Sequence, residues 1–228
     1  MIIQVTDFNE ANTVIANSYQ AEWEELRQVL EQMPLHLKAS DQAGIQGARI
    51  FDAVGTNRYI KNALTKSPLN WGANIRIPVE YNFLGTDVDF CKSGLLVEAQ
   101  FSNYPFLLNN MLRSELFFKA RTQLAGHAIG AAVIITKAHM FPASNSTLYH
   151  EQAVNQLRSL ARNHVFDVPI RLVGLFEKTG VPVRVKVTEY LNPRYSREVV
   201  AQLDYDCTMT PSRGRGRCTL SVTEIRNV

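Results

Sequence analysis

Apolar and polar residues follow two different periods along this chain. Between residues 19 and 33, apolar side chains recur at steps of three and four, the spacing of one face of an α-helix. Between Val181 and Leu191 they alternate with polar ones, which is typical of a half-buried strand. These periods predict helices at 19–33, 48–66, 107–124 and 148–162, and strands at 75–83, 95–101, 131–136, 169–175 and 181–191. Because strands and helices interleave, we expect an α/β fold.

The 228 residues are expected to form a single domain. A hydrophobic content of 46% is enough for one well-buried core, and no internal repeat or Pro/Gly/Ser-rich linker divides the chain. The last thirty residues are β-like and rich in turns. They indicate a small β-rich subdomain over about 195–228, within the domain formed by 1–228.

Features at the N-terminus and among the cysteines bear on the compartment. Residues 1–7 lack the charged and apolar regions of a signal peptide, and the longest apolar stretch, near 128–135, is too short to cross a bilayer. No membrane partner is therefore expected. Cys91, Cys207 and Cys218 are far apart and form no C-x-x-C pair, which disfavours a disulfide framework or a zinc site. We predict a reducing cytoplasm.

The formal net charge of +3 conceals an uneven distribution of charge. Residues 1–60 contain four Lys and Arg against eight Asp and Glu, so this part carries −4 and the other 168 residues carry +7. A basic region suits a polyanion such as DNA, although the same charge is common in enzymes that bind no nucleic acid. Charge therefore permits a DNA partner without requiring one.

Two carboxylates lie where a hairpin would bring them together. Asp89 precedes Glu98 by nine residues, and the turn-like residues 91–94 between them would place both on paired strands. Because side chains alternate along a strand, Gln100 shares the face of Glu98 and Ala99 points to the other. Proteins hold Mg²⁺ with one or two carboxylates plus phosphate oxygens. The pair is therefore a candidate metal site for phosphodiester hydrolysis.

The same carboxylates have a simpler interpretation, in which they only solvate one face of a sheet. Three observations favour chemistry instead. Glu98 follows the apolar run 95–97, Gln100 adds a second polar group on its face, and Ser102 and Asn103 continue with short hydrogen-bonding side chains. The residues by themselves leave both interpretations open.

A longer set of segments resembles a known enzyme family. The central segments are FLGTDVDF at 83–90, LVEAQFSNYPFLLNN at 96–110 and RSELF at 113–117. Further segments are MPLH at 33–36, KASDQA at 38–43, VGTN at 54–57, HMFPASNS at 139–146, VFDVPIRLVGL at 165–175 and RYSR at 194–197. In one register over most of 30–200, the chain resembles the Bgl II family of type II restriction endonucleases, within the PD-(D/E)xK nuclease class. The resemblance implies a mixed central β-sheet flanked by helices, with a small additional β-rich subdomain.

The resemblance also implies roles at the active site. Asp89 would bind a divalent ion, Mg²⁺ with Mn²⁺ as a substitute, and the backbone carbonyl of Ala99 would be a further ligand. Glu98 and Gln100 would position the attacking water, and Asn74 would orient metal-bound waters. Gln100 replaces the Lys that is usual in the class. Because an amide is neutral, more of the charge stabilisation would come from the metal.

Several positions match base-contacting residues of the family. Arg suits guanine, Asn suits adenine and Ser suits either. Each position has an alternative: residues 144–147 precede a helix and could cap it, Arg113 could pair with a carboxylate, and Arg197 could be an ordinary exposed residue. The Arg-Gly segment 213–217 suits a phosphate contact or a solvated turn equally well. The matched positions are Ser102, Asn103, Asn145, Ser146, Tyr195 and Arg197, with Arg113 a weaker candidate.

The implied function is that of a homodimeric type II restriction endonuclease. It would hydrolyse both strands of palindromic double-stranded DNA and leave 5′-phosphate ends. The expected site is A^GATCT, and a related GATC-centred site such as RGATCY is the alternative. The segments after Pro105 and Thr147 are candidate dimer helices, although their apolar faces fit an internal core equally well. A DNA-binding protein with an inactive site and a repair nuclease on the same fold are the competing hypotheses.

Overall fold

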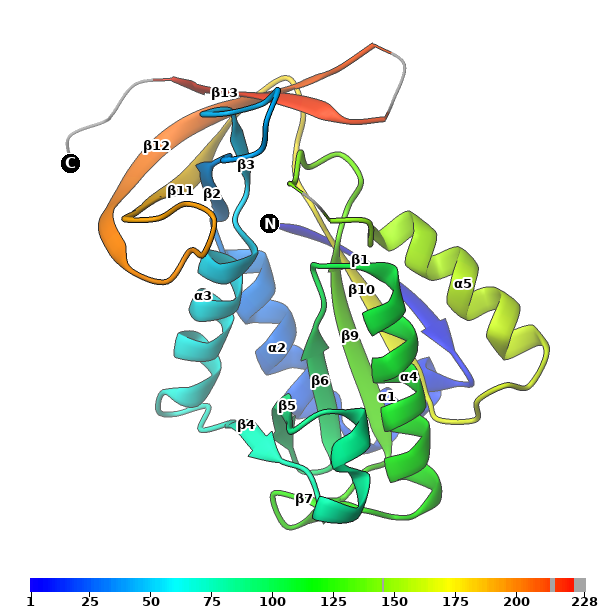
Figure 1. The fold of residues 1–228 in the computed structure, drawn as a ribbon. Coiled ribbons are helices and arrows are strands. Elements are labelled where there is room, and N and C mark those ends of the chain that lie inside the picture. Colours follow the sequence, from blue (N-terminus) through cyan, green and yellow to red (C-terminus); the bar gives the residue numbers. More distant parts are fainter. Residues whose placement is uncertain (145, 214–215, 224–228) are drawn as a thin grey trace.

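The structure, a computed structural model, describes residues 1–144, 146–213 and 216–223. Helices cover both faces of a six-stranded sheet, and a five-stranded sheet lies beyond one end of it (Figure 1). The larger sheet has the order β1 (Ile2–Phe8), β10 (Ile170–Phe176), β9 (Ala131–Lys137), β6 (Leu95–Ala99), β5 (Asp87–Lys92) and β4 (Gly72–Arg76). The smaller sheet has the order β13 (Cys218–Thr223), β12 (Val199–Pro211), β11 (Pro182–Tyr190), β2 (Leu35–Ala39) and β3 (Arg49–Phe51).

Five α-helices and a 3-10 helix complete these parts of the chain. They are α1 (Ala11–Ser18), α2 (Gln20–Gln32), α3 (Ala53–Thr65), α4 (Tyr104–Lys119), α5 (His150–Arg162) and η1 (Val79–Leu84). A short hairpin joins β7 (Gln123–Leu124) and β8 (His127–Ala128). Both sheets are mixed, because β6, β9 and β10 are parallel to one another and β2 is parallel to β11, whereas the other pairs are antiparallel. The predicted α/β fold is confirmed.

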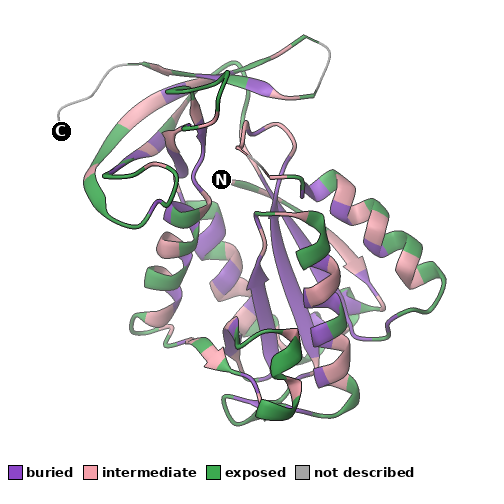
Figure 2. Cartoon of the chain, viewed as in Figure 1, coloured by how far each residue is buried: buried purple, intermediate pink, exposed green. Residues whose placement is uncertain are grey.

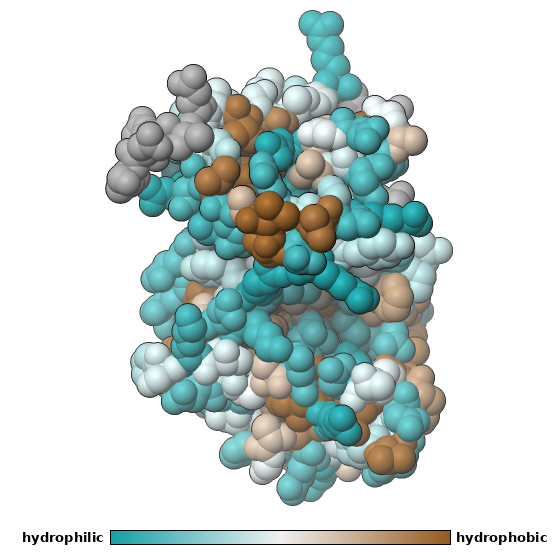
Figure 3. Space-filling model, turned by 60° about the vertical axis from the view of Figure 1, so that its left-hand side comes forward, coloured by the Kyte–Doolittle hydropathy of each residue, from teal (hydrophilic) through white to brown (hydrophobic). Residues whose placement is uncertain are grey.

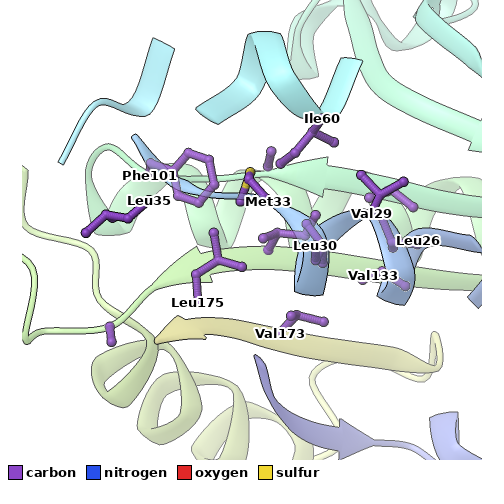
Figure 4. Close-up of a cluster of buried hydrophobic side chains, with 14 of the residues drawn as sticks. Leu26, Val29, Leu30, Met33, Leu35, Ile60, Phe101, Val133, Val173 and Leu175 are labelled. Atoms are coloured by element: carbon purple, nitrogen blue, oxygen red, sulfur yellow. The ribbon is translucent and has the colours of Figure 1, made fainter. Parts of the chain in front are cut away.

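The core consists of two clusters, one on each face of the larger sheet, and the central strands between the two clusters are buried (Figure 2). Every residue of β6 and β9 is buried. Successive residues alternate between two clusters, as the pleat of a strand requires. Val97 and Val133 pack with α2, and Figure 4 shows that cluster around Leu30. Leu96 and Ile134 belong instead to the cluster beneath α4 and α5.

The helices predicted from periodicity are all present, with shifted ends. The helix expected at 107–124 runs from Tyr104 to Lys119, and the one expected at 148–162 begins at His150. The strand expected at 75–83 is wrong in its second half. β4 ends at Arg76 and η1 follows, because Pro78 has no N–H to donate to a sheet ladder. The elements β1, α1, β2 and β3 were not predicted.

The predicted β-rich subdomain is assembled from separate parts of the chain. β12 and β13 lie in the C-terminal region, as expected, but they share their sheet with β2, β3 and β11. The expected boundary near 195 therefore misses three strands. It misses them because β2 pairs in parallel with β11, which is distant in sequence, and local patterns carry no information on such a pairing.

The helices, the surface and the cysteines have three further features. No helix in the described part of the chain is long and apolar enough to cross a membrane. Hydrophilic side chains cover most of the face shown in Figure 3, and apolar ones gather in a few patches. Cys91, Cys207 and Cys218 are buried as free thiols.

A group of buried polar side chains lies where α3 meets the smaller sheet. The Oδ2 atom of Asp52 accepts a hydrogen bond of 2.7 Å from the hydroxyl of Tyr190. His36 is 3% exposed, and neither ring nitrogen has a hydrogen-bond partner among the described residues. A Cβ at Gly55 would lie 2.4 Å from Asp52 Oδ2 and 3.2 Å from His36 Nδ1, so only glycine fits between them. Burial, with a smaller effect from the charge of Lys186, lowers the pKa of His36 to about 4.

Protonation of His36 is expected to make the protein less stable in mild acid. Its pKa in the folded chain, about 4, lies below the 6.5 of an ordinary histidine, so the unfolded chain binds more protons between these values. The stabilisation is complete above pH 6.5 and is lost as the pH falls toward 4. A shift from pH 7 to pH 5 should lower the free energy of unfolding by about 2 kcal/mol through this residue.

Urea unfolding of the wild type and of His36→Leu at these two pH values isolates that contribution. On going from pH 7 to pH 5, the free energy of unfolding of His36→Leu should fall by about 2 kcal/mol less than that of the wild type. His127→Leu, at an exposed position in β8, is the matched control and should keep the wild-type dependence. The same pH dependence in wild type and His36→Leu would contradict the lowered pKa of His36.

Candidate active site

The β5–β6 hairpin brings the two candidate carboxylates together. Phe90 pairs with Val97, and the turn at Ser93 and Gly94 uses positive φ angles of 54° and 94°. Continuing the register by one residue places Asp89 opposite Glu98, and cross-strand partners share a face of the sheet. The prediction that a hairpin pairs these carboxylates is confirmed.

Glu98 is buried beneath α4 in a salt bridge. Its side chain is 3% exposed, and its Oε1 atom accepts a hydrogen bond from the guanidinium of Arg113, whose side chain is 7% exposed. The Nη1 atom of Arg113 also donates to the carbonyl of Asp87 at 2.8 Å. Burial raises the pKa of Glu98 to about 8, although the Arg113 charge opposes the shift. The interpretation of Glu98 as a residue that only solvates a sheet face is therefore wrong.

Asp89 lies beside the Ala99 peptide. Its Oδ2 atom accepts a hydrogen bond of 2.8 Å from the Ala99 N–H. A residue in a strand directs its N–H and C=O toward the same neighbour, so the Ala99 carbonyl lies on the Asp89 side. Burial raises the pKa of Asp89, and this hydrogen bond opposes the shift. The Asp89 carboxylate and the Ala99 carbonyl thus lie on the same side of β6.

Asn74 lies across β5 from these groups. Ala73 pairs with Phe90 and Ile75 pairs with Val88, so Asn74 falls between them, next to Asp89. Its φ of 50° is in the left-handed region, where Asn is more readily accommodated than most residues. The side chain is exposed and lines a cavity of 620 Å³ with Arg76 and Asp87.

A network of polar side chains joins Glu98 to the end of β6. Asn110 on α4 accepts from the Nη2 atom of Arg113 at 3.3 Å and donates to the Gln100 side-chain oxygen at 3.3 Å. Gln100 in turn donates to the Ser102 hydroxyl at 2.6 Å. Gln100 therefore faces α4 as Glu98 does, which confirms the predicted alternation. A chain of contacts runs from a candidate catalytic carboxylate to a candidate base-contacting residue.

The segment after Phe101 is bound to the segment before α5. The hydroxyl of Ser146 lies 2.7 Å from the Phe101 carbonyl and 2.6 Å from the Ser102 carbonyl. Thr147 Oγ1 donates to the side chain of Asn103 at 3.2 Å. The proposed helix cap at 144–147 is wrong, since Tyr149 occupies the N-cap position of α5 and no side chain caps it. Asn145 lies outside the described residues.

Tyr195 and Arg197 lie in the exposed loop between β11 and β12. Tyr195 is 61% exposed, and the Arg194 guanidinium carbon lies 6.0 Å from the centre of its ring. Ser196 between them is buried, and its hydroxyl contacts the ammonium of Lys38 on β2. The same ammonium donates to the Pro193 carbonyl at 2.8 Å. The loop is thus tied to the smaller sheet while its two candidate side chains face outward.

The contacts of two arginines bear on the sequence expectations. Arg113 pairs with Glu98 and is 6% exposed, so it is not free to reach a base, and the alternative of a carboxylate partner is correct. Its close packing depends on Gly85, because a Cβ there would lie 2.8 Å from Nη1. In the segment 213–217, Arg217 donates to the Tyr149 hydroxyl at 2.9 Å, and residues 214–215 lie outside the described residues.

A cavity of 340 Å³ lies between the smaller sheet and the end of β6. Its lining brings Gln100, Ser102 and Ser146 together with Asn57 near the start of α3. Tyr195 and Arg197 do not line it. The structure thus groups most of the candidate residues around one end of β6 and leaves the Tyr195 loop apart.

Asn110 and Lys137 belong to this site but were not predicted. Asn110 precedes Arg113 by three residues and so shares its helix face, which is the signal that could have found it. Lys137 ends the otherwise apolar run of β9, and a Lys at the end of a buried strand is more commonly exposed. Its complete burial was not foreseeable from the pattern.

The donor atoms at the hairpin fit a hard divalent cation. Within the described ranges, no three His, Cys, Asp or Glu side chains gather into a metal-binding group. Asp89, the Ala99 carbonyl and the adjacent Glu98 are all oxygen donors, and the remaining positions would be left to water and phosphate. Mg²⁺ commonly binds through one or two carboxylates in this way.

A mixed sheet with paired carboxylates on adjacent strands is the arrangement expected of a metal-dependent nuclease, and comparison with known proteins agrees. The family model for restriction endonuclease BglII/BglIII matches residues 3–175. The type II restriction enzyme BglII of Bacillus subtilis is 50% identical over 223 residues, which cover 95% of this chain and 98% of that enzyme. The chain therefore belongs to the BglII/BglIII restriction endonuclease family, and the predicted enzyme class is confirmed.

Two solved structures of BglII resemble this fold. The crystal structure of BglII complexed with a DNA 16-mer matches with a TM-score of 0.93 and 49% identity, covering 98% of this chain and all of that one. Free BglII matches with a TM-score of 0.76 and 46% identity, at the same coverage. Type II restriction enzymes generally use a divalent metal ion.

Removing the cation of the buried pair is expected to destabilise the fold, because Glu98 would be left without a partner. Breaking such a pair costs about 3–5 kcal/mol, so Arg113→Met should lower the free energy of unfolding by about 3 kcal/mol. Adding Glu98→Gln should restore most of the loss, as measured by urea unfolding.

The exposed pair on α2 provides a matched control for this experiment. Arg27→Met removes a guanidinium that contacts Glu24 and Glu31 at the surface and should leave the unfolding curve nearly unchanged. Strictly additive losses for Arg113→Met and Glu98→Gln would show that the two side chains are not coupled.

Proposed function

We propose that this chain is a Mg²⁺-dependent type II restriction endonuclease that cleaves both strands of double-stranded DNA at A^GATCT. The observation that carries the proposal is the position of Asp89, Glu98 and the Ala99 carbonyl at one end of the hairpin, linked through Gln100 to Ser102. Mn²⁺ substitutes for Mg²⁺ in this proposal, because both accept oxygen ligands in octahedral geometry.

The chain's own groups have distinct parts in the proposed reaction. Asp89 and the Ala99 carbonyl hold the ion, which supplies Lewis-acid polarisation of the phosphoryl oxygen when bound. Glu98 accepts a hydrogen bond from the attacking water, since its position opposite Asp89 places it beside the ion. Gln100 orients the same water, and the Asn110 amide donates a hydrogen bond to the Gln100 side-chain oxygen. Asn74, exposed beside Asp89, orients water at the mouth of the site.

The base contacts in this proposal come from three segments. Ser102 and Asn103 follow β6, Asn145 and Ser146 precede α5, and Tyr195 and Arg197 lie in the loop after β11. The first two segments are hydrogen-bonded to one another, which supports their reading adjacent bases. Arg113 is left out, since it pairs with Glu98.

A palindromic site requires a two-fold protein, so the proposed enzyme acts as a homodimer in which each copy cuts one strand. The exposed apolar residues Phe106 and Leu112 of α4, at 51% and 49% exposure, support this helix as part of the contact. Other apolar residues of the two candidate segments, Phe117, Leu148 and Leu157, are buried in the core of one subunit. The three buried thiols support a reducing bacterial cytoplasm as its compartment.

Digestion of a plasmid that carries single AGATCT and GGATCC sites tests the proposal. With Mg²⁺ the wild type should give a discrete cut whose ends, when sequenced, read A^GATCT with a 5′-phosphate. Cutting at other GATC-centred sites would contradict A^GATCT as the recognition sequence and identify another one. Smeared DNA would favour a repair nuclease. A gel shift without cleavage would favour an inactive DNA-binding protein.

Asp89→Asn should lower the cleavage rate by at least about a thousandfold, because it removes a charged ligand of the ion. DNA binding should persist in a gel shift, since the base-contacting segments are unchanged. Asp167→Asn, an exposed carboxylate paired with Lys119, is the control and should cleave at the wild-type rate. Full activity of Asp89→Asn would remove Asp89 from the metal site.

Arg197→Ala is expected to lower kcat/KM on AGATCT by about ten- to a hundredfold, the effect of losing one base contact of 1–3 kcal/mol. The loss should be smaller on a site altered at the base pair that Arg197 reads. Arg194→Ala removes the same charge from the same exposed loop and is the matched control. Equal losses for both variants on every site would indicate a phosphate contact instead.

A further inference from the structure

Lys137 is buried at the end of β9, beside the proposed cutting and reading segments. Its side chain is completely buried, although β9 leads out of the core at this point. β9 is the parallel neighbour of β6, with Ala99 opposite Ile135 (Figure 1). The N–H of Gln100 also donates to the Ile135 carbonyl at 2.8 Å. Lys137 therefore belongs to β9, the strand whose hydrogen bonds hold the end of β6 in place.

Three oxygen atoms from two segments surround the ammonium group. Its Nζ atom donates to the Phe101 carbonyl at 2.6 Å, the Leu148 carbonyl at 3.0 Å and the Ser146 hydroxyl at 2.5 Å. An ammonium has three N–H donors, so this set uses all of them. The first acceptor directly precedes Ser102, and the other two lie in the segment that leads into α5.

An aromatic ring and the charge of Arg217 also act on the Lys137 side chain. The Tyr149 ring centre lies 4.7 Å from Nζ, within the range of a cation–π contact. Burial, with the charge of Arg217, lowers the pKa of Lys137 to about 7. The Phe101 and Leu148 carbonyls can only accept, so each requires an N–H donor from Lys137. The Ser146 hydroxyl cannot act as donor to Nζ while it donates to a backbone carbonyl.

We propose that Lys137 is a positioning residue that sets the discrimination between cognate and altered sites, by holding the segments of Ser102 and Ser146 in one geometry relative to β6. This inference rests on the proposed function. In this proposal Lys137 does not contact DNA, because its ammonium is enclosed by the chain. Without the ammonium, the carbonyls of Phe101 and Leu148 lose a donor and the two segments are free to move apart.

Lys137→Met keeps the length of the side chain and removes the three donors. The measured quantity is the ratio of kcat/KM on the wild type's own site, identified from sequenced ends, to kcat/KM on the same site with one altered base pair. Lys137→Met should lower this ratio by about tenfold or more, because a displaced reading segment penalises the correct site more than the altered one. Combined with Ser146→Ala, its effect on the ratio should be less than additive.

Lys92→Met is the matched control. Lys92 ends β5 in the same sheet and is partly buried, with Nζ bonded to Glu25 and to the Leu69 carbonyl, but it contacts no reading segment. It should lower the melting temperature and leave the ratio unchanged. A folded Lys137→Met protein that keeps the wild-type ratio within about threefold would overturn the proposal.

If Lys137→Met does not fold, a second variant tests the same proposal. Tyr149→Leu removes the ring beside Nζ and a hydroxyl that donates to the Ser146 carbonyl at 3.2 Å, but it leaves the three oxygen acceptors of Lys137 in place. It should therefore lower the ratio less, but in the same direction. An unchanged ratio in this variant would also overturn the proposal. The failure of the proposed function is distinct, because the wild type itself would then produce no site-specific cut.

Discussion

The burial of the Glu98 charge is the constraint on which the rest of the site depends. A carboxylate on a fully enclosed strand must find a cation or remain protonated, and Arg113 of α4 provides that cation. To reach it, α4 must lie across β6 with Arg113 inward, and Gly85 must leave room for the guanidinium. The same helix face then brings Asn110 to Gln100. One ion pair thus fixes the helix that organises the other polar groups.

This arrangement connects the proposed chemistry with the proposed recognition through short contacts. The network from Glu98 through Arg113, Asn110 and Gln100 ends at Ser102. From the neighbouring strand β9, Lys137 binds the adjacent Phe101 carbonyl and the segment before α5. The end of β6 is therefore held both by α4 and by Lys137. Under the proposed function, a shift at a reading residue would displace the groups that position water, which would link fidelity to rate.

The accuracy of the sequence predictions depended on how local their causes are. The helix at 19–33 and the β5–β6 hairpin follow from nearby residues, through periodicity and a Ser-Gly turn, and both formed as expected. The strand expected at 75–83 ends at Arg76 for a local reason, because Pro78 has no N–H to donate to a sheet ladder. The smaller sheet was only partly foreseen, since β2 and β11 meet across a long stretch of chain. The helix cap at 144–147 was wrong because tertiary acceptors, the carbonyls of Phe101 and Ser102, took the Ser146 hydroxyl.

By itself, the sequence determined the identity of the candidate catalytic groups and their order along the chain. Asp89, Glu98 and Gln100 occupy alternating positions on a hairpin, and the pleat of a strand fixes which of them share a face. Only the tertiary structure decided the environment of these groups. That Glu98 is enclosed, that Arg113 is its partner and that Lys137 is buried among three oxygens are results of packing between distant segments. The physical reason is that charge burial depends on what surrounds a residue in space, whereas alternation depends only on the backbone of its own strand.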